Sequence, residues 1–191
     1  TAPVRLSRLR DKVELLAAAG VDRVLCLAFN QRLRELSAEA FVRAVLVDGL
    51  GVEHLEIGDD FRFGCDRSGD FAFLQQAGQT FGFTVEEAAT VELGGARVSS
   101  TRVRQALQVA DFAVAEHLLG RPYAIAGRVV QGQQLGRQLG TPTANVQLKR
   151  HRVPLSGVFL VSVELDGVVR PGVANIGVRP SVKTDGFAHL E

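Results

Sequence analysis

The sequence of 191 residues has little of several features that would narrow its class at once. It contains only two cysteines, Cys26 and Cys65, which are too few for a disulfide framework or a cysteine metal cluster. We therefore expect reduced thiols and a cytoplasmic protein. Methionine is absent and the first residue is Thr1, so we expect the chain to be part of a longer gene product.

Long apolar runs and an excess of one charge are also missing. No run approaches the roughly 20 residues that a membrane helix needs. Arg5, Arg8 and Asp11 interrupt the stretch that a signal peptide would occupy. The net charge is +1, so no bulk field draws nucleic acid or an anionic membrane to the surface. We expect small-molecule substrates, no nucleic acid and no membrane, and the sequence leaves the oligomeric state open.

The first 120 residues or so alternate between helical spacing and apolar, strand-like stretches. Helices are predicted over 6–19, 37–49, from Asp70 through Ala77, over 98–107 and 111–119, and strands over 21–29, 52–57 and 81–85. Such alternation predicts an α/β domain with a parallel sheet, whose ligands bind at the carboxyl ends of the strands.

After Arg121 and Pro122 the pattern changes to short strands and turns. An Asp166–Gly167 pair joins the strand-like stretches 158–165 and 168–176 and predicts a type I′ hairpin. We expect two domains: a Rossmann-like α/β domain over 1–121 and a small antiparallel β-barrel over 122–191.

A glycine-rich stretch over 127–145 follows a strand that is predicted over 123–129. Its glycines Gly132, Gly136 and Gly140 leave backbone amides open to an anion. In an extended segment, Thr143 and Asn145 face the same side, and their neutral oxygens suit a magnesium ion that arrives with phosphates. The alternative is a barrel turn in which Thr143 and Asn145 are turn formers. The stretch has neither the Gly-Lys-Ser/Thr ending of a P-loop nor the Gly-x-Gly-x-x-Gly pattern of a Rossmann turn.

Two further motifs stand in the first domain. In Gly58-Asp-Asp-Phe-Arg-Phe-Gly64, Phe61 and Phe63 can stack on a planar ring while Arg62 holds a phosphate. A packed turn with a solvated aspartate pair is the alternative, and the residues alone favour it slightly.

The second motif combines three hydroxyls and an arginine at a predicted helix start. Ser99, Ser100 and Thr101 face the positive end of the helix dipole, and Arg104 lies on the face of Ser100 and Thr101. A phosphate pocket and simple N-capping by Ser99 or Ser100 account for the pattern equally well.

Taken together, the motifs resemble a known enzyme family. Gly-Asp-Asp-Phe-Arg-Phe-Gly followed by Ser-Ser-Thr-x-Val-Arg is similar to the FMN adenylyltransferase module of bifunctional prokaryotic riboflavin kinase/FAD synthetases. Gly-Arg-x-Leu-Gly-x-Pro-Thr-Ala-Asn resembles the nucleotide loop of their riboflavin kinase barrel. The motifs stand in the family's order and span nearly the whole chain. The resemblance implies that the parent protein phosphorylates riboflavin to FMN with ATP and adenylylates FMN to FAD.

The resemblance also implies roles for individual residues. The residues that would bind flavin are Asp60, Phe61, Arg62 and Phe63. Those that would bind ATP are Ser99, Ser100, Thr101, Arg104, Gly132, Gly136, Gly140, Thr143 and Asn145. Thr143 and Asn145 would contact Mg²⁺ with ATP. Glu191, which follows the Gly172-Val-Ala-Asn-Ile-Gly177 segment, would be the base that acts on the riboflavin 5′-hydroxyl.

The chain departs from the family at both ends. The adenylyltransferase has a His-x-Gly-His signature near its start, and no two of the four histidines here, His54, His117, His151 and His189, have that spacing. We expect the chain to begin after that signature and to stop before the remaining barrel strands and the C-terminal helix. Whether this piece alone is active stays open.

Two other functions remain as alternatives. One is a non-catalytic module that binds a nucleotide or oligonucleotide on an OB-like barrel, although few rings in the second half, Tyr123, Phe159 and Phe187, could stack on bases. The other is a different nucleotidyltransferase with an accessory barrel, against which the Thr-Ala-Asn loop argues.

Overall fold

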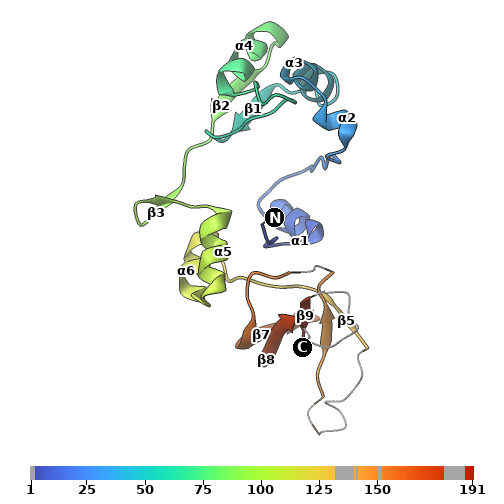
Figure 1. Ribbon diagram of the computed structural model, residues 1–191, viewed down its shortest axis with the longest axis vertical. Helices are drawn as coiled ribbons and strands as arrows, with labels where there is room; N and C mark the ends of the chain where they lie inside the picture. The colour runs from blue at the N-terminus through green and yellow to red at the C-terminus, as the bar shows by residue number, and fades with distance from the viewer. Residues whose placement is uncertain (1–2, 132–139, 141, 150–151, 179–187) are drawn as a thin grey trace. The chain divides into compact units, whose positions relative to one another are not determined.

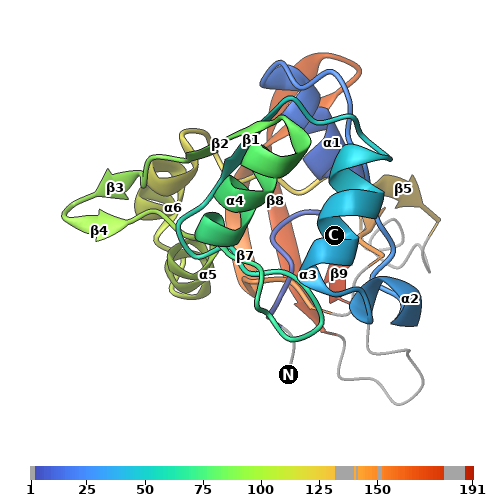
Figure 2. The same cartoon turned by 90° about the horizontal axis from the view of Figure 1, so that it is seen from above.

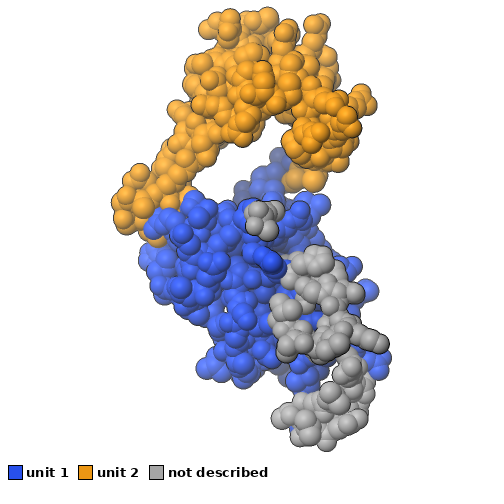
Figure 3. All heavy atoms as spheres, in the orientation of Figure 1, with its two compact units in different colours: residues 1–23, 99–191 blue, residues 24–98 orange. Residues whose placement is uncertain are grey.

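The computed structural model of the chain describes residues 3–131, 140, 142–149, 152–178 and 188–191. The chain divides into two compact units, one over residues 24–98 and one that joins residues 1–23 to 99–191 (Figure 3). The first unit contains short parallel strands and helices, and the second contains helices and an antiparallel sheet.

The unit over 24–98 is organised by two parallel strands, β1 (His54–Ile57) and β2 (Thr84–Glu87). Helix α4 (Phe71–Phe81) connects them, as parallel strands require, and it packs against β2 (Figures 1 and 2). The apolar core of the unit consists of Ala38, Val42, Leu46, Ile57, Phe63, Leu74, Ala77 and Phe83. The parallel pairing confirms the α/β prediction for this part of the chain.

The remaining elements of this unit are short. They are α2 (Gln31–Arg34), α3 (Ala38–Phe41), the π-helix η1 (Val42–Val47), and the antiparallel strands β3 (Glu92–Leu93) and β4 (Ala96–Arg97). Helix α3 runs directly into η1, so the helix predicted over 37–49 is present.

Polar side chains begin these helices where the sequence predicts them. The Ser37 hydroxyl accepts a hydrogen bond from the Ala40 amide at 3.1 Å, and the Asp70 carboxylate accepts one from the Phe73 amide at 2.9 Å. Each bond satisfies an amide that the first helical turn leaves unpaired. Gly82, with φ of 84°, ends α4 in the left-handed region that glycine adopts without strain. Both helices therefore begin where the sequence predicts them.

The strand predicted over 21–29 is wrong. All of these residues are exposed, and none belongs to a strand of the described sheets. The apolar composition of the segment raises its strand propensity, but a strand forms only where a neighbouring chain segment completes the hydrogen-bond ladder. Among the described residues no segment pairs with it.

In the unit that joins 1–23 to 99–191, the described residues form the helices α1 (Leu9–Ala18), α5 (Ser100–Gln108) and α6 (Phe112–Leu119). Helices α5 and α6 pack against each other. Their buried residues are Val103, Ala106, Leu107, Ala115 and Leu118. The Asp111 carboxylate accepts from the Val114 amide at 3.0 Å, which confirms the predicted start of α6.

The same unit contains a five-stranded antiparallel sheet with the strand order β5-β6-β9-β8-β7. Strands β5, β7, β8 and β9 are labelled in Figure 1. The strands are β5 (Arg128–Val130), β6 (Asn145–Gln147), β7 (Gly157–Leu165), β8 (Val168–Val178) and β9 (Ala188–Leu190). The antiparallel architecture that the sequence predicts is confirmed. The described strands form an open sheet, because no pairing in the part of the chain described here joins the edge strands β5 and β7.

The predicted hairpin is the longest pairing in this sheet. Strands β7 and β8 pair from Gly157 opposite Ile176 to Leu165 opposite Val168. Asp166 and Gly167 have φ of 51° and 76°, the two positive values that a type I′ turn requires. By contrast, the strand predicted over 123–129 forms only at Arg128–Val130.

Candidate functional site

The loop after β1 is held by backbone hydrogen bonds. The Phe61 amide donates to the Gly58 carbonyl at 3.1 Å, and Phe63 exchanges hydrogen bonds of 3.0 and 3.1 Å with Gly69. A Cβ at Gly69 would lie 2.6 Å from the Phe63 ring, so only glycine fits beside that ring. These contacts fix the loop 58–64 at the carboxyl end of β1, the edge where parallel sheets place their ligand loops.

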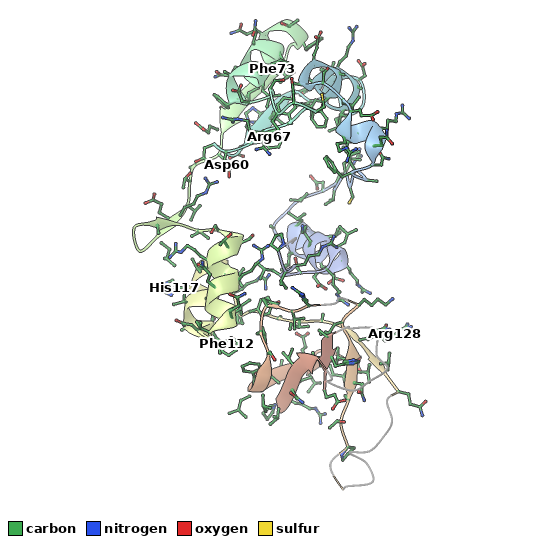
Figure 4. The ribbon with its side chains drawn as sticks, in the orientation of Figure 1. Asp60, Arg67, Phe73, Phe112, His117 and Arg128 are labelled. Carbon is green, nitrogen blue, oxygen red and sulfur yellow. The ribbon has the colours of Figure 1, made fainter. Side chains whose placement is uncertain are left out.

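The two phenylalanines of this loop have different environments. Phe63 is 8% exposed and lies in an aromatic cluster, 5.4 Å from Phe41 and 5.9 Å from Phe73 between ring centroids. Phe73 is labelled in Figure 4. Phe61 stacks on Phe63 at 5.5 Å and is 38% exposed. The sequence predicts that both rings can stack on a flavin, but the burial of Phe63 leaves the outward ring of Phe61 as the one that a ligand can reach.

The two aspartates of the loop are paired with an arginine that the sequence argument did not identify. Arg97 on β4 contacts Asp59 at 2.7 Å and Asp60 at 3.5 Å, and Asp60 is labelled in Figure 4. The hydrogen bond from Arg97 holds the pKa of the Asp59 carboxyl below its ordinary value. Arg62 donates from Nη1 to the Phe61 carbonyl at 2.8 Å. The loop therefore has one guanidinium of its own, that of Arg62, and its two aspartates are paired with the guanidinium of Arg97 on β4.

A sequence signal for Arg97 exists. Gly94 and Gly95 both have positive φ, 62° and 71°, as a tight hairpin turn requires. A Gly-Gly pair between short strands predicts such a hairpin, and a cation on that hairpin would interact favourably with two adjacent aspartates. Combining the two signals would have pointed to Arg97.

The turn that begins α5 lies in the other unit. The Ser99 hydroxyl accepts from the Arg102 amide at 3.3 Å and so caps the helix, while Ser100 and Thr101 are exposed in its first turn. Arg104 is half-buried and donates from Nε to the Val4 carbonyl at 2.6 Å. It forms no ion pair with any carboxylate in the described part of the chain. Capping is thus present, and two hydroxyls remain exposed beside an arginine.

The glycine-rich stretch is described only in part. Gly132 and Gly136 lie outside the described residues. Gly140 has φ of 82°, a conformation that favours glycine. Thr143 is exposed, and Asn145 is the half-buried first residue of β6, opposite Val130 of β5.

The sheet register brings two predicted site residues together. Val146 of β6 pairs with Leu190 of β9, so Asn145 and Glu191 occupy the next opposite positions of the antiparallel ladder. Glu191 exchanges backbone hydrogen bonds of 2.8 and 3.0 Å with Asn175 of β8. Backbone groups of successive residues point to opposite neighbours, so Asn145 and Glu191 form a non-hydrogen-bonded pair with Cα atoms about 4.5 Å apart. Their side chains share one face of the sheet.

Two features of the described residues concern metal ions and membranes. Among the described residues, no cluster of three histidine, cysteine or acidic side chains is arranged to hold a metal ion. In that same part of the chain, no helix is both long and apolar enough to cross a membrane.

Comparisons with known proteins identify both halves of the chain. A family model described as FAD synthetase matches residues 1–102, more than half of the 191, and one described as riboflavin kinase matches residues 119–191. A bifunctional riboflavin kinase/FMN adenylyltransferase of Pseudomonas fluorescens is 70% identical over 191 residues, which are 100% of this chain and 61% of that protein.

A protein with the same description from Escherichia coli (strain K12) is 53% identical over 182 residues, 95% of this chain and 58% of that protein. The chain thus spans about three fifths of the length of these relatives. A crystal structure described as a macrolide-efflux protein from Streptococcus pneumoniae has a TM-score of 0.79 at 29% identity, and the match covers 98% of this chain and 60% of that chain. The chain therefore belongs to the FAD synthetase family, with a segment that matches the riboflavin kinase family behind the FAD synthetase segment.

Proposed function

We propose that the full-length protein, meaning the gene product that contains these residues, converts riboflavin and ATP to FMN and ADP. It then converts FMN and a second ATP to FAD and pyrophosphate. The observation that carries the proposal is the placement of Asn145 opposite Glu191 inside the segment that matches riboflavin kinase. A carboxylate beside an amide oxygen on one sheet face supplies the two kinds of group that phosphoryl transfer to an alcohol needs.

In the kinase step, Glu191 accepts the proton of the riboflavin 5′-hydroxyl as that oxygen forms its bond to the γ-phosphorus of ATP. The bond from the γ-phosphorus to the bridging oxygen breaks, and ADP leaves. The protein mainly positions the reactants and provides a group for the proton. Glu191 is half-buried, and two hydrogen bonds fix its main chain to β8, directly after the end of β9.

The donor set next to Glu191 fits Mg²⁺ that is bound to ATP. The exposed hydroxyl of Thr143 and the amide oxygen of Asn145 are neutral oxygen ligands of the kind that Mg²⁺ accepts alongside phosphates and water. Thr143 and Asn145 would hold the ion, which when bound neutralises charge on the phosphate oxygens. Gly140, with its positive φ, lies in the glycine-rich stretch that we assign to the phosphates of ATP.

In the adenylyl step, we assign the flavin to the loop 58–64 and the ATP phosphates to the turn 99–104. Phe61 offers an exposed ring for stacking, and Phe63 supports it from the core. Arg62 and the Asp60–Arg97 pair supply charged hydrogen-bonding groups beside that ring. Ser100, Thr101 and Arg104 supply hydroxyls and a guanidinium at a helix N-terminus, which suits an anion.

We keep the domain boundary between residues 121 and 122 as a proposal. The two family models leave residues 103–118 between them, so a boundary near residue 121 lies within a few residues of the start of the second model. The compact units divide the chain differently, at residues 23 and 98.

A product assay tests the proposed function. The full-length protein is incubated with riboflavin, ATP and Mg²⁺, and flavins are separated by chromatography over time. FMN is expected first and FAD afterwards. Binding of nucleotide without any flavin product would instead favour the non-catalytic module.

Removing the guanidinium of Arg62 is expected to weaken use of FMN in the adenylyl step. In Arg62→Ala the KM for FMN should rise roughly tenfold, because a charge-assisted hydrogen bond to the phosphate is lost. Riboflavin phosphorylation should be unchanged, because Arg62 lies in the unit over 24–98 and the kinase residues do not. Arg67→Ala is the matched control, since it removes the same charge from an exposed position shortly after the loop (Figure 4). Equal loss of both activities would point to a folding defect.

Removing the guanidinium of Arg104 is expected to raise the apparent ATP constant for FAD formation by roughly tenfold. The melting temperature should change little, because Arg104 loses only its bond to the Val4 carbonyl. Steady-state kinetics with varied ATP measure the effect, and Arg102→Ala on the same helix is the control. A large loss of stability with unchanged ATP dependence would mean that Arg104 has only a packing role.

A further inference from the structure

The polar row that contains Asn145 and Glu191 continues onto a third strand. Asn175 of β8 is the hydrogen-bonded partner of Glu191, with both backbone bonds present at 2.8 and 3.0 Å. Such pairs have Cα atoms about 5.5 Å apart and side chains on the same face. Asn145, Glu191 and Asn175 therefore follow one another across β6, β9 and β8, with the carboxylate in the middle.

The order of this row separates the two substrates of a phosphoryl transfer. Asn145 and Asn175 are two strand spacings apart, roughly 10 Å. This inference rests on the proposed kinase function, which places the nucleotide toward Asn145 and the reacting hydroxyl at Glu191. Attacking and leaving oxygens are roughly in line through the phosphorus. The body of the acceptor alcohol must then extend away from the nucleotide, toward Asn175.

The environment of Asn175 leaves its side chain open to a ligand. Its neighbours Ala174 and Ile176 are 7% and 5% exposed and belong to the buried face, while Asn175 is exposed on the opposite face. Its carboxamide makes no hydrogen bond with any other described residue. A carboxamide both donates and accepts, which complements an alcohol hydroxyl that does the same.

We propose that Asn175 binds the acceptor substrate, through a hydroxyl of the acceptor's chain next to the one that is phosphorylated. This makes the row a three-part site: Asn145 for the nucleotide side, Glu191 for the proton, and Asn175 for the acceptor chain. The acceptor class it selects is an alcohol with several neighbouring hydroxyls, as in the ribityl chain of riboflavin.

The test compares Asn175→Ala with wild type in the full-length protein. The KM for riboflavin should rise roughly three- to tenfold, which corresponds to one lost neutral hydrogen bond. Turnover at saturating riboflavin and the KM for Mg-ATP should stay within about twofold, because the lost contact is equally present before and during reaction. Val173→Ala is the matched control, since Val173 is exposed on the same face of β8, two residues farther from Glu191. It should leave all constants unchanged.

A second acceptor separates binding from a general disturbance of Glu191. With a flavin whose chain carries only the terminal hydroxyl, Asn175→Ala and wild type should have the same KM. An unchanged KM for riboflavin, an equal penalty with both acceptors, or a loss in turnover alone would each overturn the assignment. If wild-type protein phosphorylates no riboflavin at all, the proposed kinase function fails, and this assignment fails with it.

Discussion

Replacing Glu191 with glutamine is expected to lower the turnover of riboflavin phosphorylation by roughly 10²- to 10⁴-fold, the usual contribution of a general base. Glutamine keeps the shape of the side chain and the backbone bonds to Asn175, but it cannot take up the hydroxyl proton. The affinity for ATP should stay near normal, because Thr143, Asn145 and the glycine-rich stretch carry nucleotide binding in this account. Initial rates with varied ATP and riboflavin measure both quantities.

Asn145→Ala is the comparison for this result. It removes an oxygen on the nucleotide side of the row, so it should weaken Mg-ATP binding as well as the rate. FAD formation from supplied FMN should survive both changes and serves as the folding control. If Glu191→Gln keeps near wild-type FMN production, Glu191 is a strand residue and another carboxylate acts as the base.

Truncating Phe63 to alanine is expected to destabilise the unit over 24–98 by about 3–5 kcal/mol, as is usual for a buried phenylalanine. Phe63 is 8% exposed and contacts three other aromatic rings, so its loss leaves a cavity in the core rather than a surface change. Hydrogen exchange of peptides from α4 and β1 should report the lower free energy of opening. Peptides from β7 and β8, in the other unit, provide the internal reference.

Phe61→Ala is the matched variant in the same loop. Phe61 is 38% exposed, so its truncation should cost about 1 kcal/mol of stability, mostly the stacking on Phe63. Its main effect should fall on the KM for FMN in the adenylyl step. Equal destabilisation by the two truncations would show that Phe61 is also a core residue and would remove it from the proposed flavin contact.

The parts of the fold that were predicted correctly rest on local interactions. Ser37, Asp70 and Asp111 cap helices through contacts three residues along the chain. Asp166 and Gly167 set the β7–β8 hairpin through their own backbone angles. Residues within one turn of each other determine such features, so their identities are sufficient to predict them.

The parts that could not be predicted depend on distant segments. The stretch 21–29 has a strand-like composition but no described pairing partner, and composition does not reveal that. Phe61 and Phe63 have the same side chain, and only the packing of Phe41 and Phe73 decides which ring is buried. The ion pair of Asp59 with Arg97 joins the loop to a separate hairpin.

The candidate kinase site combines one feature that local spacing predicts with others that depend on distant segments. The i, i+2 spacing of Thr143 and Asn145 predicts their shared side without any tertiary information, provided that the segment is extended. The family resemblance predicts the role of Glu191, whereas the register of β6, β9 and β8 shows which residues lie beside it across the sheet. That register is what adds Asn175 to the site, because no spacing along the chain relates it to Asn145.

Following the α- and γ-phosphates of ATP tests most directly whether one protein carries out two successive transfers. The full-length protein is given riboflavin and Mg²⁺ with ATP that is labelled either on the γ-phosphate or on the α-phosphate. The account predicts that the γ label enters FMN and is carried into FAD, whereas the α label enters FAD and never FMN. Absence of the γ label from FMN would contradict the kinase assignment, and absence of the α label from FAD would contradict the adenylyltransferase assignment.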